Sequence, residues 1–273
     1  MRGSVDGLVL RETATGESDK LLTVLTAEYG RILINAKGVR SIKSKNMSLS
    51  RLFTYGNFEF YEKNGMRWLA GGSVNNSFFG LNDDVESFAL AAYVVDIASE
   101  ISGEGISAED TLRATLNTLY AIEKKLKPLE LIKGAYELFA AFHSGFEPDV
   151  SACRSCGEES AEIFFFDIMN GSLICESCMK KRSVPHGVTD EVDAYLSRNI
   201  MFPINTSVAA AVRYVSVAPI NRLFSFDLKE SGDISDFSRL GETYLQNHLE
   251  RGFDTLSFFK TVSRLNDDAE RKN

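Results

Sequence analysis

Long apolar runs are missing from this 273-residue sequence. No segment approaches the ~18–20 consecutive apolar residues needed to cross a bilayer. The first residues, Met1–Asp6, also lack the apolar core of a secretory signal peptide. We therefore expect a cytoplasmic protein with no membrane partner. In that reducing compartment its four cysteines are not expected to form lasting disulfides.

Motifs of common enzyme classes are missing as well. The sequence has neither the G-x-x-x-x-G-K-[ST] phosphate loop nor the G-x-S-x-G nucleophile elbow. The segment 103–108 fits G-x-G-x-x-A, but it follows a helical pattern rather than a strand. Histidine occurs three times, at His143, His186 and His248, and never in a catalytic pattern. A zinc deaminase would need an H-x-E partner, which the chain lacks. We expect no enzymatic activity.

Acidic residues are absent from one stretch, residues 35–51, although the chain as a whole is acidic with a net charge of −8. The first 80 residues carry eleven basic and seven acidic side chains, a net charge of +4, which leaves −12 for the rest. A split of this size predicts two domains with different partners, 1–80 and 81–273. A polyanion suits the first domain, because the local field steers a charged ligand.

The first 80 residues have the pattern of a small β-barrel. Short apolar and β-branched runs are separated by turn signals, and Asn64-Gly65 predicts a tight hairpin because both residues tolerate positive φ. Barrel closure would remove the exposed strand edges. The five predicted strands are Val5–Thr13, Leu21–Thr26, Arg31–Ala36, Phe53–Tyr61 and Met66–Val74.

Beyond residue 82 the apolar period becomes helical. One helix is predicted from the face formed by Val85, Phe88, Ala89, Ala92 and Tyr93. A second is predicted to begin at Ser107, with Asp110 completing a capping box. A third is predicted to open at Pro128 and end near Gly145, and a further helix contains the buried-type positions Phe237, Leu240, Tyr244 and Leu245.

All four cysteines lie in one segment, as two C-x-x-C pairs separated by eighteen residues. This spacing is typical of a zinc site, because each pair directs two sulfurs at one ion from a tight turn. The ligands would be Cys153, Cys156, Cys175 and Cys178, with a hairpin at Asn170-Gly171 between them. Four protein ligands leave no open position, so the Zn²⁺ is expected to be structural. A redox dithiol pair and a catalytic zinc are the alternatives. Basic side chains that can moderate the thiolate charge are Arg154, Lys180, Lys181 and Arg182.

Two interpretations of the basic stretch compete. It can be a solvated loop whose charge only aids solubility. Alternatively it binds nucleic-acid phosphates on the barrel, with aromatic residues between Phe53 and Trp68 providing stacking surfaces, although alternation should place about half of those in the core. The phosphate-binding candidates are Lys37, Arg40, Lys43, Lys45 and Arg51.

The sequence resembles the RecO family of bacterial recombination mediators. The resemblance lies in "GLVLRETATGESDKLLTVLTAEYGRILINAKGVRSIKSK", with its G-E-S-D and A-K-G-x-R pattern, and in "CRSCG…FFFD…NGSLICESC". The terminal "YLQNHLERGFDTLSFF" is a weaker match, and residues 183–235 match nothing in the family pattern. The A-K-G-x-R match places Lys37 and Arg40 at a DNA-binding face, whereas Lys43, Lys45 and Arg51 join them from charge alone.

The resemblance implies an α+β protein: an N-terminal five-stranded OB-fold barrel, then an α-helical domain with an inserted zinc knuckle at 153–178. It also implies a nucleoid-associated DNA-repair protein that binds single- and double-stranded DNA and anneals complementary strands. The implied partners are RecR, the C-terminal tail of the single-stranded-DNA-binding protein and, indirectly, RecA. Two other classes stay open, namely a zinc-ribbon adaptor that binds RNA or protein, and a metal-dependent nuclease.

Overall fold

A computed structural model describes residues 2–182 and 200–270. The chain divides into two compact units, Met1–Leu126 with Phe253–Asn273, and Lys127–Gly252. The first unit therefore contains helices as well as the strand-rich segment. The predicted division at residue 80 follows a change of sequence period and stays a prediction. Among the described residues, no helix has the length and apolar character that a bilayer crossing requires.

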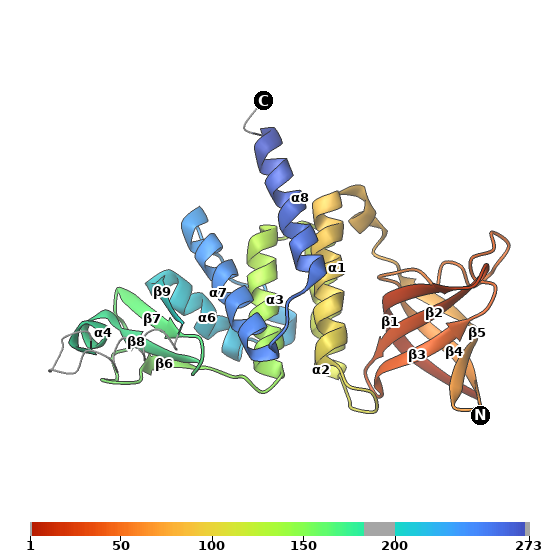
Figure 1. The fold of residues 1–273 in the computed structure, drawn as a ribbon, viewed down its shortest axis with the longest axis horizontal. Coiled ribbons are helices and arrows are strands. Elements are labelled where there is room, and N and C mark those ends of the chain that lie inside the picture. Colours follow the sequence, from red (N-terminus) through yellow and green to blue (C-terminus); the bar gives the residue numbers. More distant parts are fainter. Residues whose placement is uncertain (1, 183–199, 271–273) are drawn as a thin grey trace. The chain divides into compact units, whose positions relative to one another are not determined.

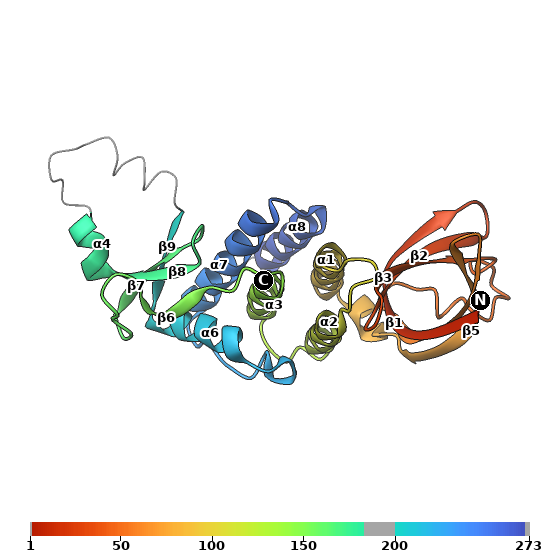
Figure 2. The same cartoon turned by 90° about the horizontal axis from the view of Figure 1, so that it is seen from below.

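The N-terminal strands form a closed barrel in the order β1-β2-β3-β5-β4 (Figures 1 and 2). Antiparallel pairing connects all neighbours except β3 and β5, which run parallel and close the barrel. All five predicted strands are present. Their bounds are β1 Arg2–Thr15, β2 Asp19–Thr26, β3 Gly30–Ala36, β4 Tyr55–Lys63 and β5 Met66–Asn76.

The barrel is filled by one row of side chains from each strand, as the period of two requires. The predicted hairpin is also present: Lys63 pairs with Met66, and φ is +53° at Asn64 and +72° at Gly65. The predicted start of the fourth strand was wrong, because Phe53 has a φ of +65° and lies in a turn before Tyr55. The buried core residues are Val5, Val9, Leu22, Val24, Ile32, Ile34, Ala36, Val39, Leu49 and Phe58.

Helices complete the first unit. The 3₁₀ helix η1 (Phe79–Asp83) leads into α1 (Val85–Ile101), which packs on α2 (Glu109–Glu123) and on α8 (Asp254–Glu270). Asp84 begins α1 by accepting hydrogen bonds from the backbone N–H groups of Glu86 and Ser87. The prediction of one buried face was wrong for the first residue, Val85, which is exposed. Ala89 and Tyr93 are buried as predicted.

The predicted start of the second helix at Ser107 was wrong. The first residue of α2 is Glu109, and its N-cap residue, Ala108, makes no side-chain cap hydrogen bond. The Ser107 hydroxyl instead donates to the Ala27 carbonyl at 3.0 Å, while the Ala108 N–H donates to the same oxygen at 2.9 Å. The segment before α2 is therefore bound to the β2–β3 turn. A capping-box pattern cannot reveal this competitor, because Ala27 is 80 residues away in sequence.

The second unit combines helices with a four-stranded sheet of order β6-β8-β7-β9 (Figure 1). Helix α3 begins directly after Pro128, and Gly145 follows its end with a φ of +94°, as predicted. Neither β9 nor α6 was predicted. The elements are α3 Leu129–His143, β6 Asp149–Cys153, β7 Ile163–Asp167, β8 Ser172–Cys175, α4 Glu176–Arg182, β9 Met201–Asn205, α6 Thr206–Val217, η2 Ile220–Arg222 and α7 Ser231–Leu249.

Helices α3 and α7 approach each other closely at two glycines. A Cβ added at Gly241 would lie 2.8 Å from the Gly134 carbonyl oxygen, and one at Gly134 would lie 2.9 Å from the Phe237 ring. Only glycine permits this backbone approach. The side chains on α7 that were predicted to be buried, from Phe237 to Leu245, are all buried.

A charged network is buried beside this crossing. The Lys133 ammonium nitrogen lies 3.1 Å from a Glu137 carboxylate oxygen and 3.0 Å from a Glu242 oxygen. It also donates to the Ser238 hydroxyl at 3.2 Å, and that hydroxyl donates to Glu130. Burial alone would lower the pKa of Lys133, but attraction from the three carboxylates outweighs it and raises that pKa. Lys133 is therefore charged at neutral pH.

We predict that Lys133→Met destabilises the second unit. Removing one partner of a buried ion pair typically costs about 3–5 kcal/mol, because the remaining charges stay buried without compensation. Hydrogen–deuterium exchange of peptides from α3 and α7 measures the loss. Lys229→Met, at an exposed lysine of the same unit, is the matched control. Unchanged protection of α3 and α7 in Lys133→Met would contradict the prediction.

Candidate functional site

The basic residues singled out from the sequence lie on one irregular segment between β3 and β4 of the barrel. It consists of successive turns, in which the Ser44 N–H donates to the Ser41 carbonyl and the Ser50 N–H to the Asn46 carbonyl. Within the described residues, none of the five basic side chains forms an ion pair with a carboxylate. All five are exposed: Lys37, Arg40, Lys43, Lys45 and Arg51.

This segment is bonded to the β1–β2 turn by three hydrogen bonds. Asp19 Oδ1 accepts from the Gly38 N–H at 2.8 Å. The Arg40 N–H donates to the Ser18 carbonyl at 3.0 Å, and Arg40 Nη1 donates to the Gly16 carbonyl at 3.0 Å. Gly38 has a φ of +65°, a conformation that glycine adopts without strain. The G-E-S-D and A-K-G-x-R stretches are thus in direct contact.

Asp19 is an acidic residue in contact with the basic segment, and its carboxylate accepts hydrogen bonds from the Gly38 N–H and the Ser18 hydroxyl. Hydrogen bonds from the Gly38 N–H and the Ser18 hydroxyl, together with attraction from Lys37, lower the pKa of the Asp19 carboxyl. Asp19 is consequently ionised at neutral pH and fixes the backbone at Gly38. Sequence reasoning recognised G-E-S-D only as a turn and a family motif, so this contact was missed.

Lys37 and Trp68 form a cation–π pair. The Lys37 Nζ lies 4.6 Å from the centre of the Trp68 ring, within the range for such an interaction. Trp68 is placed by the parallel pairing of β3 and β5, in which it is opposite Asn35. The half-buried ring and the exposed ammonium form one surface at the end of β3.

The remaining aromatic candidates divide as alternation predicts. Phe58 is buried in the barrel, and Phe60 packs partly against the same core. Tyr61, on the outward side of β4, is 39% exposed. Phe53 is buried outside the barrel, where its ring meets Phe88 of α1 edge-on with centroids 5.4 Å apart. Tyr61 and Trp68 are therefore the accessible aromatics of the predicted set, with Tyr55 half-buried.

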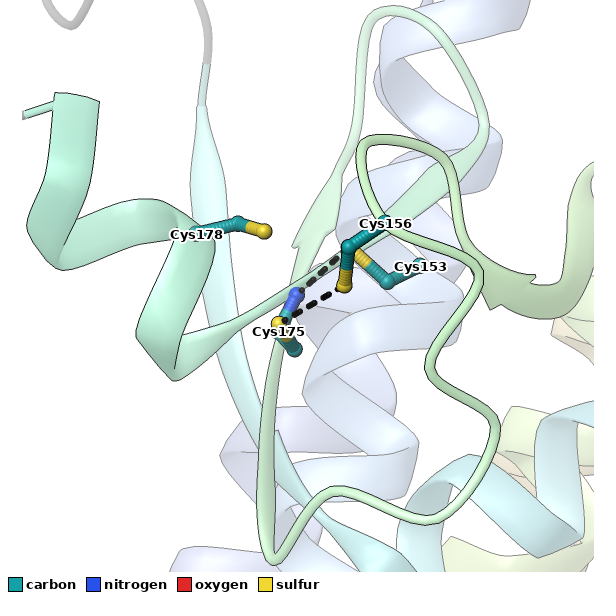
Figure 3. A group of neighbouring side chains, drawn as sticks. All are labelled: Cys153, Cys156, Cys175 and Cys178. Carbon is teal, nitrogen blue, oxygen red and sulfur yellow. Dashed lines mark hydrogen bonds between the residues drawn. The ribbon is translucent and has the colours of Figure 1, made fainter.

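The four cysteines come from three elements of the second unit (Figure 3). Cys153 ends β6 and Cys156 follows it in a tight turn, where Gly157 has a φ of +75°. Cys175 ends β8, and Cys178 lies on α4. The hairpin through Asn170-Gly171 connects β7 and β8 as predicted.

The sulfur positions fit a single tetrahedral metal ion. All four Sγ atoms lie within 4.8 Å of one another, and Cys156 Sγ lies 3.6 Å from Cys175 Sγ. A tetrahedron with Zn–S bonds of about 2.3 Å has S···S edges of about 3.8 Å. The cluster can therefore hold a metal with four thiolate ligands.

The thiols have unequal acidities. Burial would raise the pKa of Cys153, but hydrogen bonds from the backbone N–H groups of Cys175, Ser155 and Cys156 lower it to about 6. Hydrogen bonding with Cys156 and Cys175 raises the pKa of Cys178 to about 12. One thiolate is favoured and further ionisation is opposed, because like charges at this spacing repel. A bound cation would offset the repulsion between the thiolates.

The basic residues near the cysteines have other partners. Arg154 Nη1 donates to the Ser172 hydroxyl at 3.3 Å, and Lys180 pairs with Glu176 at 2.7 Å. Lys181 is exposed. The side chain of Arg182 lies outside the described residues. Moderation of the thiolate charge by these residues stays a prediction.

The two histidines within the described residues pack against aromatic rings. The His143 ring lies 4.0 Å from that of Phe139. His248 hydrogen-bonds through Nε2 to the Ile168 carbonyl at 3.0 Å and lies against the ring of Tyr244. Burial lowers the pKa of His248, against a smaller opposing effect of that hydrogen bond. His186 lies outside the described residues.

A closed barrel with strand order 1-2-3-5-4 is an OB-fold, the class of small barrel that elsewhere binds oligonucleotides. Here it is followed by helices and an inserted four-cysteine knuckle. The sequence matches the family "Recombination protein O N terminal" over residues 1–78 and "Recombination protein O C terminal" over residues 82–257. The chain belongs to the RecO family.

Relatives named "DNA repair protein RecO" align over most of the chain. The protein of Acetivibrio thermocellus is 26% identical over 260 residues, which cover 95% of this chain and 96% of that protein. That of Alkaliphilus metalliredigens is 25% identical and covers 94% and 98%. That of Listeria monocytogenes serovar 1/2a is 27% identical over 225 residues, with 82% and 81% covered.

We predict that Asp19→Ala loosens the basic segment. The Gly38 N–H loses its acceptor, so its hydrogen exchange, measured by NMR, should accelerate several-fold at neutral pH. Because folding lowers the pKa of Asp19, its contribution is present above the ordinary value of 3.8 and is lost as pH falls through the lower folded value. Glu17→Ala in the same turn is the control. Equal exchange of Gly38 in both variants would refute the role of Asp19.

Proposed function

We propose that this chain is a DNA-binding recombination mediator of DNA repair that acts without catalysis. It binds single- and double-stranded DNA through the barrel and anneals complementary strands. With RecR it assists the loading of RecA on DNA covered by the single-stranded-DNA-binding protein, whose C-terminal tail it contacts. Because its ligand would be chromosomal DNA, the proposed location is the bacterial nucleoid.

The observation that carries this proposal is the set of five exposed cationic side chains, which have no carboxylate partner among residues 2–182 and 200–270, on an OB-fold of the RecO family. If the charges only aided solubility, the backbone that carries them would not need a fixed conformation. Three hydrogen bonds fix the backbone around Gly38 and Arg40, and Lys37 lies over Trp68. Fixed cations beside an accessible aromatic suit a sugar–phosphate chain with exposed bases.

Annealing follows from charge neutralisation. Two strands repel through their phosphates, and bound cations reduce that repulsion by releasing counterions. Contacts of this kind do not depend on base sequence. The same segment can therefore hold any strand while its bases find their complements.

We predict a defined salt dependence for binding to single strands. Five phosphate contacts give a slope of log affinity against log salt of about −3.5, at roughly −0.7 per contact. The double variant Lys37→Glu/Arg40→Glu should reduce the slope to about −2 and weaken binding. Fluorescence anisotropy with labelled oligonucleotides measures both quantities.

The matched control for this experiment is Lys63→Glu/Lys229→Glu, at two exposed lysines that are not part of the basic segment. It should leave the slope unchanged. Equal slopes for the wild type and Lys37→Glu/Arg40→Glu would indicate that the basic segment only aids solubility. Strand shortening with Mg²⁺ would indicate a nuclease, and preference for RNA over DNA of equal length would indicate an RNA adaptor.

We further propose that the cysteine cluster binds one structural Zn²⁺. Cys153, Cys156, Cys175 and Cys178 would supply all four ligands, so no position is left for water or substrate. The ion would hold the turn after β6, the end of β8 and the start of α4 together. The donor set and the spacing of the sulfurs support this assignment.

Metal analysis of the purified protein should find about one zinc per chain. Cys175→Ser should lose the metal and become sensitive to protease within residues 153–178, because metal binding organises such segments. Ser177→Ala, an exposed neighbour of the ligands, should behave as the wild type. A zinc-free wild type with a Cys–Cys disulfide would favour the redox alternative.

A further inference from the structure

One cavity of the first unit is lined by Arg51 of the basic segment together with residues outside that segment. It has a volume of about 530 Å³ and lies between the barrel, the end of the basic segment and η1. This size is within the range of small-molecule sites. Its lining combines two cations, one carboxylate, aromatic rings and neutral polar groups, among them Arg51, Lys20, Glu12, Phe53, Phe79, Phe88, Ser77 and Asn82.

Phe79 is the unusual residue of this cavity. Its side chain is 65% exposed, whereas its neighbours Phe78 and Leu81 are buried. The backbone is fixed around it: Phe78 has a φ of +45°, the Phe78 N–H donates to Asn76 Oδ1, and the Gly80 N–H donates to Glu123 at 3.0 Å. A left-handed phenylalanine is strained, and such strain often occurs at functional sites. The fold thus presents Phe79 to solvent instead of burying it.

The polar groups around Phe79 are suited to a nucleotide. Arg51 is exposed and has no ion-pair partner in the described part of the chain. The other cation that lines the cavity, Lys20, forms an ion pair with Glu12 at 2.5 Å and donates a hydrogen bond to the Ser50 carbonyl. Asn82 lines the cavity, and its amide nitrogen donates to the Phe79 carbonyl, so its Oδ1 is not engaged by that bond.

We infer that this cavity binds one unpaired base of a DNA single strand, stacked on Phe79, with the adjoining phosphate on Arg51. The inference rests on the proposed function and adds a ligand and a residue that charge alone does not indicate. Base–aromatic stacking tolerates any base, as a mediator without sequence preference requires. Arg51 belongs to both the basic segment and the cavity lining, so a strand bound along the segment would continue to the cavity that Phe79 lines.

The test compares two strands of equal length and charge: oligo(dT) and the same backbone with abasic sites. Both present the same phosphates, so the difference in their affinities isolates the bases. The wild type should bind oligo(dT) at least about fivefold more tightly, since one stacked base contributes ~1–3 kcal/mol. Phe79→Ala should reduce that preference about fivefold or more while its affinity for the abasic strand is unchanged.

Two further variants separate stacking from a folding defect. Phe79→Trp retains a stacking ring and should retain the preference. Phe258→Ala removes a phenylalanine of the same unit that is 49% exposed and should have no effect. Strands carrying 5-iododeoxyuridine should photo-crosslink to the peptide that contains Phe79.

The possible failures are distinguishable. A wild type that binds neither strand would overturn the proposed function and this site with it. Binding to both strands with equal affinity, or an equal loss for both strands in Phe79→Ala, would overturn the base site alone. An unaffected preference in Phe79→Ala would likewise overturn it and would leave Phe79 as a contact for another protein.

Discussion

The hydrogen bond between the Asp19 carboxylate and the Gly38 N–H is the contact on which the conformation of the basic segment depends. An acidic protein that keeps a cationic segment must prevent its own carboxylates from neutralising it. Asp19 contacts that segment, and its oxygen is bonded to the backbone there. The same bond fixes Gly38 beside Lys37 and Arg40. One carboxylate thereby orders the cations without forming an ion pair with them.

The elements with a strong local period were predictable, and the contacts between them were not. Alternation and Asn64-Gly65 predicted the barrel, and the cysteine spacing predicted the cluster. Ser107 was misassigned as a cap because its hydroxyl bonds to Ala27, a partner distant in sequence. The positive φ of Phe53 and the exposure of Phe79 fit neither the period of a strand nor that of a helix, because tertiary packing determines both. The segment β9–α6 had no motif to mark it.

In the second unit, the contact between α3 and α7 likewise could not be predicted from the sequence. The sequence has Gly134 and Gly241 in helices, where glycine is locally unfavourable. The reason for glycine at both positions is visible only in the structure, where the backbones of α3 and α7 come into contact. Lys133 lies at a position that a solvated helix face would also explain, yet it is buried among three carboxylates. Such a network contributes little net stability and restricts the helices to one arrangement, because a shifted crossing would leave charges unpaired.

The proposed phosphate and base contacts make opposite demands on annealing. Phosphate contacts favour pairing, because they leave base edges free and reduce the repulsion between strands. Stacking holds a base away from its complement, so a continuous row of stacking residues would oppose annealing. One cavity with one exposed ring, Phe79, avoids this conflict: it anchors a single nucleotide while the rest of the strand stays available. The five cations along the basic segment would then hold that strand through its phosphates.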